Sequence, residues 1–131
     1  MQIILALLAL AGCAAVERRP DAAGQALEAP FRAPGVVVTG LGGIARLGDV
    51  EVRPLAILED SRCPGDVVCI WAGRVRVRVT ISGVPGEPEM EIGEPVALPG
   101  GGAILLTAVA PHPSHRSPSP APARFAFIRR D

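Results

Sequence analysis

Short apolar runs separated by glycine and proline fill the chain from Gly35 onward. These runs are rich in β-branched residues, and several alternate apolar with polar positions, which is typical of half-buried β-strands. The expected strands are Val36–Thr39, Ile44–Leu47, Val50–Leu58, Ile70–Ile81, Glu87–Leu98, Ala103–Val109 and Ala123–Arg129. No segment shows a convincing helical period. The sequence therefore predicts an all-β domain at residues 35–131, a small antiparallel β-sandwich or barrel of about seven strands.

Two of these strands can be aligned by their charges. Arginine alternates with valine along residues 74–79, and glutamate recurs with the same period of two along residues 87–91. Residues two apart share one face of a strand, so a turn at Ser82-Gly83 sets three arginines opposite three glutamates. The expected pairs are Arg78 with Glu87, Arg76 with Glu89 and Arg74 with Glu91. Since the charges match one for one, we favour a solvated, self-paired face over an anion-binding face. Pro85 and Pro88 lack a ladder donor, so the following strand should lie at a sheet edge or contain a bulge.

The first residues have the pattern of an export signal. Residues 2–11 are apolar after Gln2, and this run is too short to cross ~30 Å of hydrocarbon as a mature helix. It ends in Leu10-Ala11-Gly12-Cys13, which resembles the bacterial lipobox. The resemblance implies a lipoprotein signal peptide at residues 1–12 and lipidation of Cys13, whose acyl chains would anchor the protein in a membrane. The alternative is a buried apolar helix with an incidental cysteine.

The sequence around the expected cleavage site adds two details. No Lys or Arg precedes the apolar run, which departs from the usual signal peptide and suggests that translation starts further upstream. Ala14 follows the cysteine, and the absence of Asp there resembles the sorting signal for the outer membrane. Residues 13–34 are rich in Ala, Pro and charge, so we expect the lipidated Cys13 to be followed by a flexible tether.

Composition narrows the expected partners. The basic residues number 13, all of them Arg, and they are balanced by 13 Asp and Glu. Aromatic residues make up 3% of the chain, and Tyr is absent. The chain therefore has neither the net positive charge nor the stacking platforms typical of nucleic-acid binding. We expect no nucleic-acid partner and no cofactor.

The most distinctive stretch surrounds Cys63 and Cys69. With Cys13 lipidated, these are the two remaining thiols, and an exported protein meets an oxidising compartment, so they should form a disulfide. Asp-Ser-Arg-Cys-Pro at Asp60–Pro64 and Val-Val-Cys-Ile-Trp-Ala-Gly at Val67–Gly73 resemble the shared motifs of a family of small uncharacterised bacterial lipoproteins and secreted proteins. The resemblance covers roughly residues 35–131, and it departs from the family at His112, where relatives often have an aromatic residue. It implies a β fold and an envelope location, and it carries no activity.

The disulfide loop has two interpretations. As a structural staple, Trp71 would cover the disulfide and enter the core, while Arg62 would bridge a nearby carboxylate. As a recognition loop, it would present Asp60, Arg62, Asp66 and Trp71 to a partner. We favour the staple, although a rigid loop also suits an interface.

Residues with catalytic or metal-binding chemistry are few. Ser61, His112 and Asp60 are the residue types of a hydrolase triad, but the Gly-x-Ser-x-Gly elbow is missing. His112 and His115 are weak metal candidates, and the two cysteines could complete a copper or zinc site if their thiols were free. We therefore expect neither catalysis nor a resident metal.

Together these patterns predict a lipid-anchored, non-enzymatic domain of the bacterial envelope, held in the outer membrane and facing the periplasm. It would act by binding or by structural support, with the membrane as one partner and an unidentified envelope protein as another. The first alternative is a copper- or zinc-binding or redox protein that uses Cys63, Cys69, His112 and His115. The second is an inhibitor of an envelope hydrolase.

Overall fold

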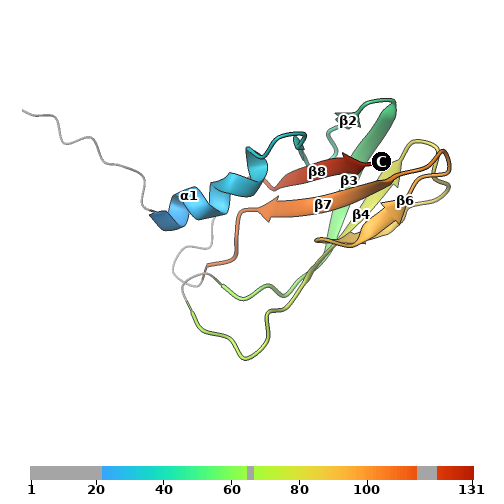
Figure 1. The fold of residues 1–131 in the computed structure, drawn as a ribbon. Coiled ribbons are helices and arrows are strands. Elements are labelled where there is room, and N and C mark those ends of the chain that lie inside the picture. Colours follow the sequence, from blue (N-terminus) through green and yellow to red (C-terminus); the bar gives the residue numbers. More distant parts are fainter. Residues whose placement is uncertain (1–21, 65–66, 115–120) are drawn as a thin grey trace, which may run out of the picture.

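The computed structural model describes residues 22–64, 67–114 and 121–131 (Figure 1). Its strands form two four-stranded antiparallel sheets, with the orders β1-β8-β7-β6 and β2-β3-β4-β5. The strands are β1 (Val37–Gly40), β2 (Ala45–Leu47), β3 (Val50–Asp60), β4 (Val75–Ile81), β5 (Glu89–Glu91), β6 (Pro95–Ala97), β7 (Ala103–Ala110) and β8 (Arg124–Arg130). The expected small antiparallel all-β fold is confirmed. Of the two expected architectures, sandwich and barrel, the structure has the sandwich, with eight strands where about seven were expected.

The apolar faces of the two sheets enclose one core. In β4, the valines at 75, 77 and 79 are buried and the residues between them are not. Phe125 and Phe127 of β8 are fully buried in the same apolar cluster from the other sheet. Alternation along β4 thus sends its valine face inward, and burial of this apolar surface at roughly 25 cal/mol per Å² stabilises the fold.

The charged face of β4 is self-paired as expected. The three ion pairs are Arg74 with Glu91 at 3.4 Å, Arg76 with Glu89, and Arg78 with Glu87 at 3.8 Å. Glu59 of β3 joins them, 3.2 Å from the Arg74 Nε and 3.4 Å from the Arg76 Nη1. The arginine stripe is therefore neutralised by carboxylates from both neighbouring strands.

The expected register of this hairpin is wrong by two residues. In the ladder, Arg76 lies opposite Glu91 and Arg78 opposite Glu89, so the ion pairs run diagonally. The turn forms where expected, because the Val84 N–H donates to the Ile81 carbonyl at 3.0 Å. Two extra residues are then accommodated at 85–87, where proline cannot donate and Gly86 adopts φ +78°. A shift of two keeps each side chain on its face.

Two of the expected strands differ from the observed ones by more than two residues. The single strand expected at 87–98 is divided into β5 and β6. Each of them lies at the edge of its own sheet, in agreement with the edge position predicted from Pro85 and Pro88. Gly93, at φ +84°, lies between them, and its N–H donates to the Leu106 carbonyl at 2.9 Å. The strand expected to begin at Ile70 begins at Val75 instead.

A helix occupies part of the segment expected to be coil. α1 (Ala22–Glu28) and the 3₁₀ turn η1 (Ala29–Phe31) lie beside the ends of β7 and β8 (Figure 1). Arg124 of β8 forms an ion pair with Glu28 at 2.7 Å, and its guanidinium lies 4.7 Å from the centre of the Phe31 ring. The expectation of no helix is wrong because an alanine-rich stretch favours helix and these contacts give a short helix the tertiary support it needs. The tether before residue 22 stays a prediction.

Candidate recognition site at the tip of the β3–β4 hairpin

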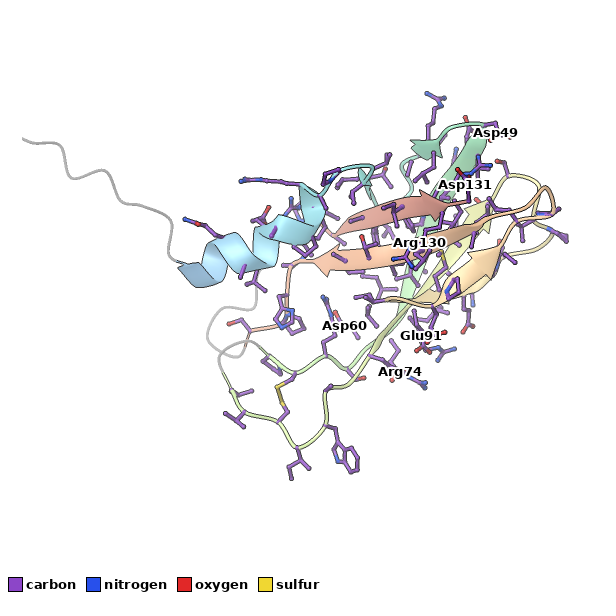
Figure 2. All side chains as sticks on the ribbon, in the orientation of Figure 1. Asp49, Asp60, Arg74, Glu91, Arg130 and Asp131 are labelled. Carbon is purple, nitrogen blue, oxygen red and sulfur yellow. A yellow bond between two sulfur atoms is a disulfide. The ribbon has the colours of Figure 1, made fainter. Side chains whose placement is uncertain are left out.

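The disulfide loop is a continuation of the β3–β4 hairpin beyond the ends of the sheets (Figure 2). The Ser61 N–H donates to the Arg74 carbonyl at 2.8 Å, and the Cys63 N–H donates to the Ala72 carbonyl at 3.1 Å. The Ser61 hydroxyl also accepts a hydrogen bond from the Arg74 N–H at 3.0 Å. The two arms of the loop are therefore tied together by backbone hydrogen bonds up to the disulfide.

Glycine is required at position 73 for this close approach. Gly73 has φ +68°, and a Cβ built there would lie 1.7 Å from the Ser61 carbonyl oxygen. Any other residue would meet both the steric penalty of positive φ and an overlap with the facing strand. The glycine of the Trp-Ala-Gly motif thus sets how narrowly the hairpin closes.

The expected disulfide between Cys63 and Cys69 is present, with a Cα–Cα distance of 5.8 Å. It closes a ring of seven residues in which the Val67 N–H donates to the Pro64 carbonyl at 3.2 Å. Such a ring reduces the conformational freedom of the unfolded chain by roughly 2 kcal/mol on the chain-entropy estimate. Asp66, inside the ring, lies outside the described residues.

Arg62 fastens the hairpin to the end of β7. Its Nε and Nη2 each donate to one carboxylate oxygen of Asp60 at 2.8 Å. Its Nη1 donates to the Val109 carbonyl at 2.6 Å, and its Nη2 to the Pro111 carbonyl at 3.1 Å. The Arg62 side chain is 11% exposed. The hydrogen bond from Arg62 is the main cause that lowers the pKa of Asp60. The expected bridge from Arg62 to a nearby carboxylate is made to Asp60. These two side chains act as a clamp between the hairpin and the end of β7.

The residue types of a hydrolase triad lie near one another but have other partners. The Ser61 hydroxyl oxygen lies 3.2 Å from both a Glu59 carboxylate oxygen and the Arg74 carbonyl oxygen, and these two acceptors share its one hydrogen. A His112 ring nitrogen, Nε2, lies 3.0 Å from the Cys63 carbonyl oxygen, which makes a second link between the hairpin and the segment after β7. These contacts give both side chains a structural role at the base of the hairpin.

In the structure, two of the four residues proposed as metal ligands, Cys63 and Cys69, are not free to bind a metal. Cys63 and Cys69 are joined to each other, and a thiolate ligand requires a free sulfur. His115 lies outside the described residues. Within the part of the chain that the structure describes, no three His, Cys, Asp or Glu side chains are grouped as metal ligands would be.

The tip itself is apolar and faces solvent. Trp71 is 82% exposed, Ile70 is 94% exposed, and Val68 is fully exposed. The expectation that Trp71 covers the disulfide and enters the core is wrong, because the hairpin carries this residue beyond the ends of both sheets, while the core is filled from the strands themselves. The aromatic residue therefore belongs to an exposed apolar surface, which we call the tip (Val68, Ile70 and Trp71).

A groove of about 470 Å³ lies at the same end of the sandwich, between α1–η1 and the outer face of β7. Ala26 and Leu27 of α1 line one side, and Arg62 and His112, the two residues that hold the hairpin, line another. The second half of α1 and the base of the hairpin are thus neighbours. The hydrogen bond from Arg124 is the main cause that lowers the pKa of Glu28, so the docked helix carries an ionised carboxylate at neutral pH.

Two residues of the tip were missed by sequence reasoning. Val68 and Ile70 belong to an uncharged stretch, residues 67–73, between Asp66 and Arg74. The pattern predicts a strand from Ile70 and places Val68 in the disulfide loop without a role of its own, so neither residue is predicted to form an exposed surface. Among the expected recognition residues, Trp71 is exposed, whereas Arg62 and Asp60 are held in the clamp. Cys13 and residues 1–12 lie outside the described residues.

Comparisons of the chain with protein-family models, with curated proteins and with solved structures gave no match. No helix in the described part of the chain is long and apolar enough to cross a bilayer.

Proposed function

We propose that this protein is a lipid-anchored envelope domain that acts by binding, through the tip of its β3–β4 hairpin, and not by catalysis. The observation that carries the proposal is the exposure of Val68, Ile70 and Trp71 on a loop held by a disulfide, a hydrogen-bonded ladder and the Arg62 clamp. Large apolar side chains gathered on an exposed, ordered surface are typical of interaction sites.

The anchor is proposed from the sequence. Leu10-Ala11-Gly12-Cys13 resembles the lipobox, and lipidation of Cys13 would hold the domain in the outer membrane, facing the periplasm. A disulfide between Cys63 and Cys69 suits the same location, because such bonds persist in oxidising compartments. The resemblance to a family of small envelope lipoproteins stays part of this proposal.

The rigidity of the hairpin favours binding over a purely structural role. A flexible loop must be ordered when it binds, which costs about 0.5–1.5 kcal/mol for each immobilised side chain. Here the backbone at the tip is already restrained by the disulfide on one side and by Gly73 on the other. An inhibitor of an envelope hydrolase would present the same feature to an enzyme cleft, so that alternative is a special case of the proposal.

The intact mass of protein isolated from its native membrane tests the proposal. An acylated Cys13, a gain of two hydrogen atoms on reduction and the absence of stoichiometric copper or zinc would support it. Free thiols with bound metal would overturn it in favour of the metal-binding or redox alternative. An unacylated chain that starts before Cys13 would refute the anchor.

The binding role needs a separate measurement. A photo-reactive phenylalanine analogue at position 70 should cross-link to a component of the envelope in living cells, whereas the same analogue at Leu41, an exposed residue between β1 and β2, should not. Equal cross-linking from both positions would contradict a specific role for the tip.

A further inference from the structure

We infer that the ligand of the tip is the bilayer itself, with Val68, Ile70 and Trp71 inserted into the interface of the membrane that holds Cys13. The inference rests on the proposed lipid anchor and names the partner of the same site. The lipid would then hold the domain at two points, the acylated cysteine and the hairpin tip, and so fix its orientation to the membrane surface.

The chemistry of the tip matches a lipid interface. Residues 67–73 contain no charged side chain, and the charges at the base of the hairpin are already paired, since Asp60 and Arg62 neutralise each other. Tryptophan is enriched at membrane interfaces, where an apolar ring and a polar N–H are both accommodated, and Ile and Val favour the adjacent acyl region. Insertion of Val68, Ile70 and Trp71 would remove exposed apolar surface from water.

The position of the tip also favours the membrane. In Figure 1 α1 and the disulfide hairpin lie at the same end of the sandwich. The groove lined by Leu27 of α1 and by Arg62 and His112 confirms that the two features are neighbours. Eight residues, 14–21, separate Cys13 from α1, and they span about 30 Å at full extension. The anchor would therefore hold this end of the domain next to the lipid.

A membrane explains the shape of the site better than a protein partner does. The tip is a narrow projection, with apolar side chains at its end and no complementary charged rim among the described residues from 67 to 73. A protein interface of standard size buries about 800 Å² on each partner and has a polar rim. A short apolar projection beside a lipid anchor can instead insert into a fluid bilayer, which needs neither a large matching surface nor a polar rim.

Fluorescence of Trp71 tests this directly, because it is the single tryptophan of the chain. The acylated mature protein would be reconstituted into phosphatidylcholine vesicles, with and without bromine atoms on the acyl chains. We expect the bromolipid to quench Trp71 and the bilayer to shield it from aqueous acrylamide. The variant Val68→Ser/Ile70→Ser keeps the tryptophan and should lose both effects while it remains attached to the vesicles.

A second measurement separates insertion from anchoring. The mature chain with Cys13→Ser carries no lipid, so its partition into phosphatidylcholine vesicles reports on the tip alone. Adding Val68→Ser/Ile70→Ser should lower the partition coefficient by at least about tenfold, from the apolar area removed. The control Leu41→Ser/Ile44→Ser removes two exposed apolar side chains outside the tip and should leave partition unchanged. Because the tip is uncharged, raising the salt concentration should have no effect.

Each contrary outcome has a definite meaning. If Cys13 is acylated but Trp71 remains accessible to acrylamide and unquenched by bromolipid, insertion is refuted and the anchor stands. If Cys13 is not acylated, the anchor fails, and the partition measurement still decides whether the tip enters lipid. If Trp71 is shielded only in native membranes and protease treatment of those membranes exposes it, the partner is a protein and the inference is overturned. Circular dichroism and the mass of the disulfide-bonded form check that each variant folds.

Discussion

Replacing Arg62 by methionine should destabilise the whole domain, although the residue belongs to a loop. Methionine keeps most of the aliphatic stem and removes the guanidinium, which donates to Asp60, Val109 and Pro111. A hydrogen bond to a charged group contributes about 1.5–3 kcal/mol, and a buried acceptor left without a donor is unfavourable. The Asp60 side chain is 29% exposed, so water can replace part of the hydrogen bonding that its carboxylate loses. We therefore expect the free energy of unfolding to fall by about 3 kcal/mol.

Urea denaturation followed by far-UV circular dichroism measures this change. Trp71 fluorescence is unsuitable as a global probe because the residue is 82% exposed in the folded state. The matched control is Arg46→Met, since Arg46 is 73% exposed and forms its ion pair with Glu51 at 3.0 Å on the surface. That variant should differ from the parent by about 0.5 kcal/mol or less.

The result that would refute the clamp is an equal effect of Arg62→Met and Arg46→Met. A double-mutant cycle with Asp60→Asn refines the test: the two side chains contact each other, so their effects should be non-additive by about 1 kcal/mol or more. Additive losses would mean that Arg62 acts through the two β7-end carbonyls and not through the carboxylate.

Three further predictions concern the same hairpin. Gly73→Ala should lower the free energy of unfolding by at least about 2 kcal/mol more than Gly83→Ala, as measured by urea denaturation. Both glycines have positive φ, but of the two only a Cβ at position 73 would overlap the backbone of the facing arm. Cys63→Ser/Cys69→Ser should cost about 2 kcal/mol, and reduction of the parent should reproduce that loss; a smaller effect would mean that the ladder alone orders the loop. The lowered pKa of Asp60, ordinarily 3.8, means that its contribution to stability is complete above about pH 4 and is lost as the pH falls through the folded-state value. Asp60→Asn should therefore flatten the acid limb of the stability profile, and an unchanged acid limb would contradict this assignment.

The sequence predicted those features of the fold that a single physical rule determines. Alternating valine and arginine in β4 has one way to bury its valines, so the two faces of the strand and its charge partners could be predicted, although not the residue at which it begins. The pairing of Cys63 with Cys69 could be predicted from the count of thiols together with the expected export to an oxidising compartment. The exact register could not be predicted, because it depends on two residues inserted at 85–87, and an even shift leaves the pattern of faces unchanged.

The other errors arose where residue type does not determine the environment. A short alanine-rich segment is helical only with tertiary support, and the support for α1 comes from Arg124, which lies 96 positions after Glu28. Ile70 and Trp71 are as apolar as core residues, so they were assigned to a strand and to the core. Whether an apolar residue is buried depends on where the hairpin leaves the sheets, and that is set by Gly73 and the disulfide together.

The distribution of aromatic residues gives the strongest argument that the tip is functional. The chain has three Phe and one Trp. Phe125 and Phe127 fill the core, and Phe31 packs under the Arg124 guanidinium. The one Trp, the residue with the largest apolar side chain, is left in solvent, on a hairpin whose backbone is restrained by a ladder, a disulfide and a clamp. Exposing it opposes folding, since its burial would contribute roughly 1.5–3 kcal/mol as for other large apolar side chains. A domain with so few aromatic residues would gain more from packing Trp71 inside, so its outward position is better explained by a binding role than by the stability of the fold.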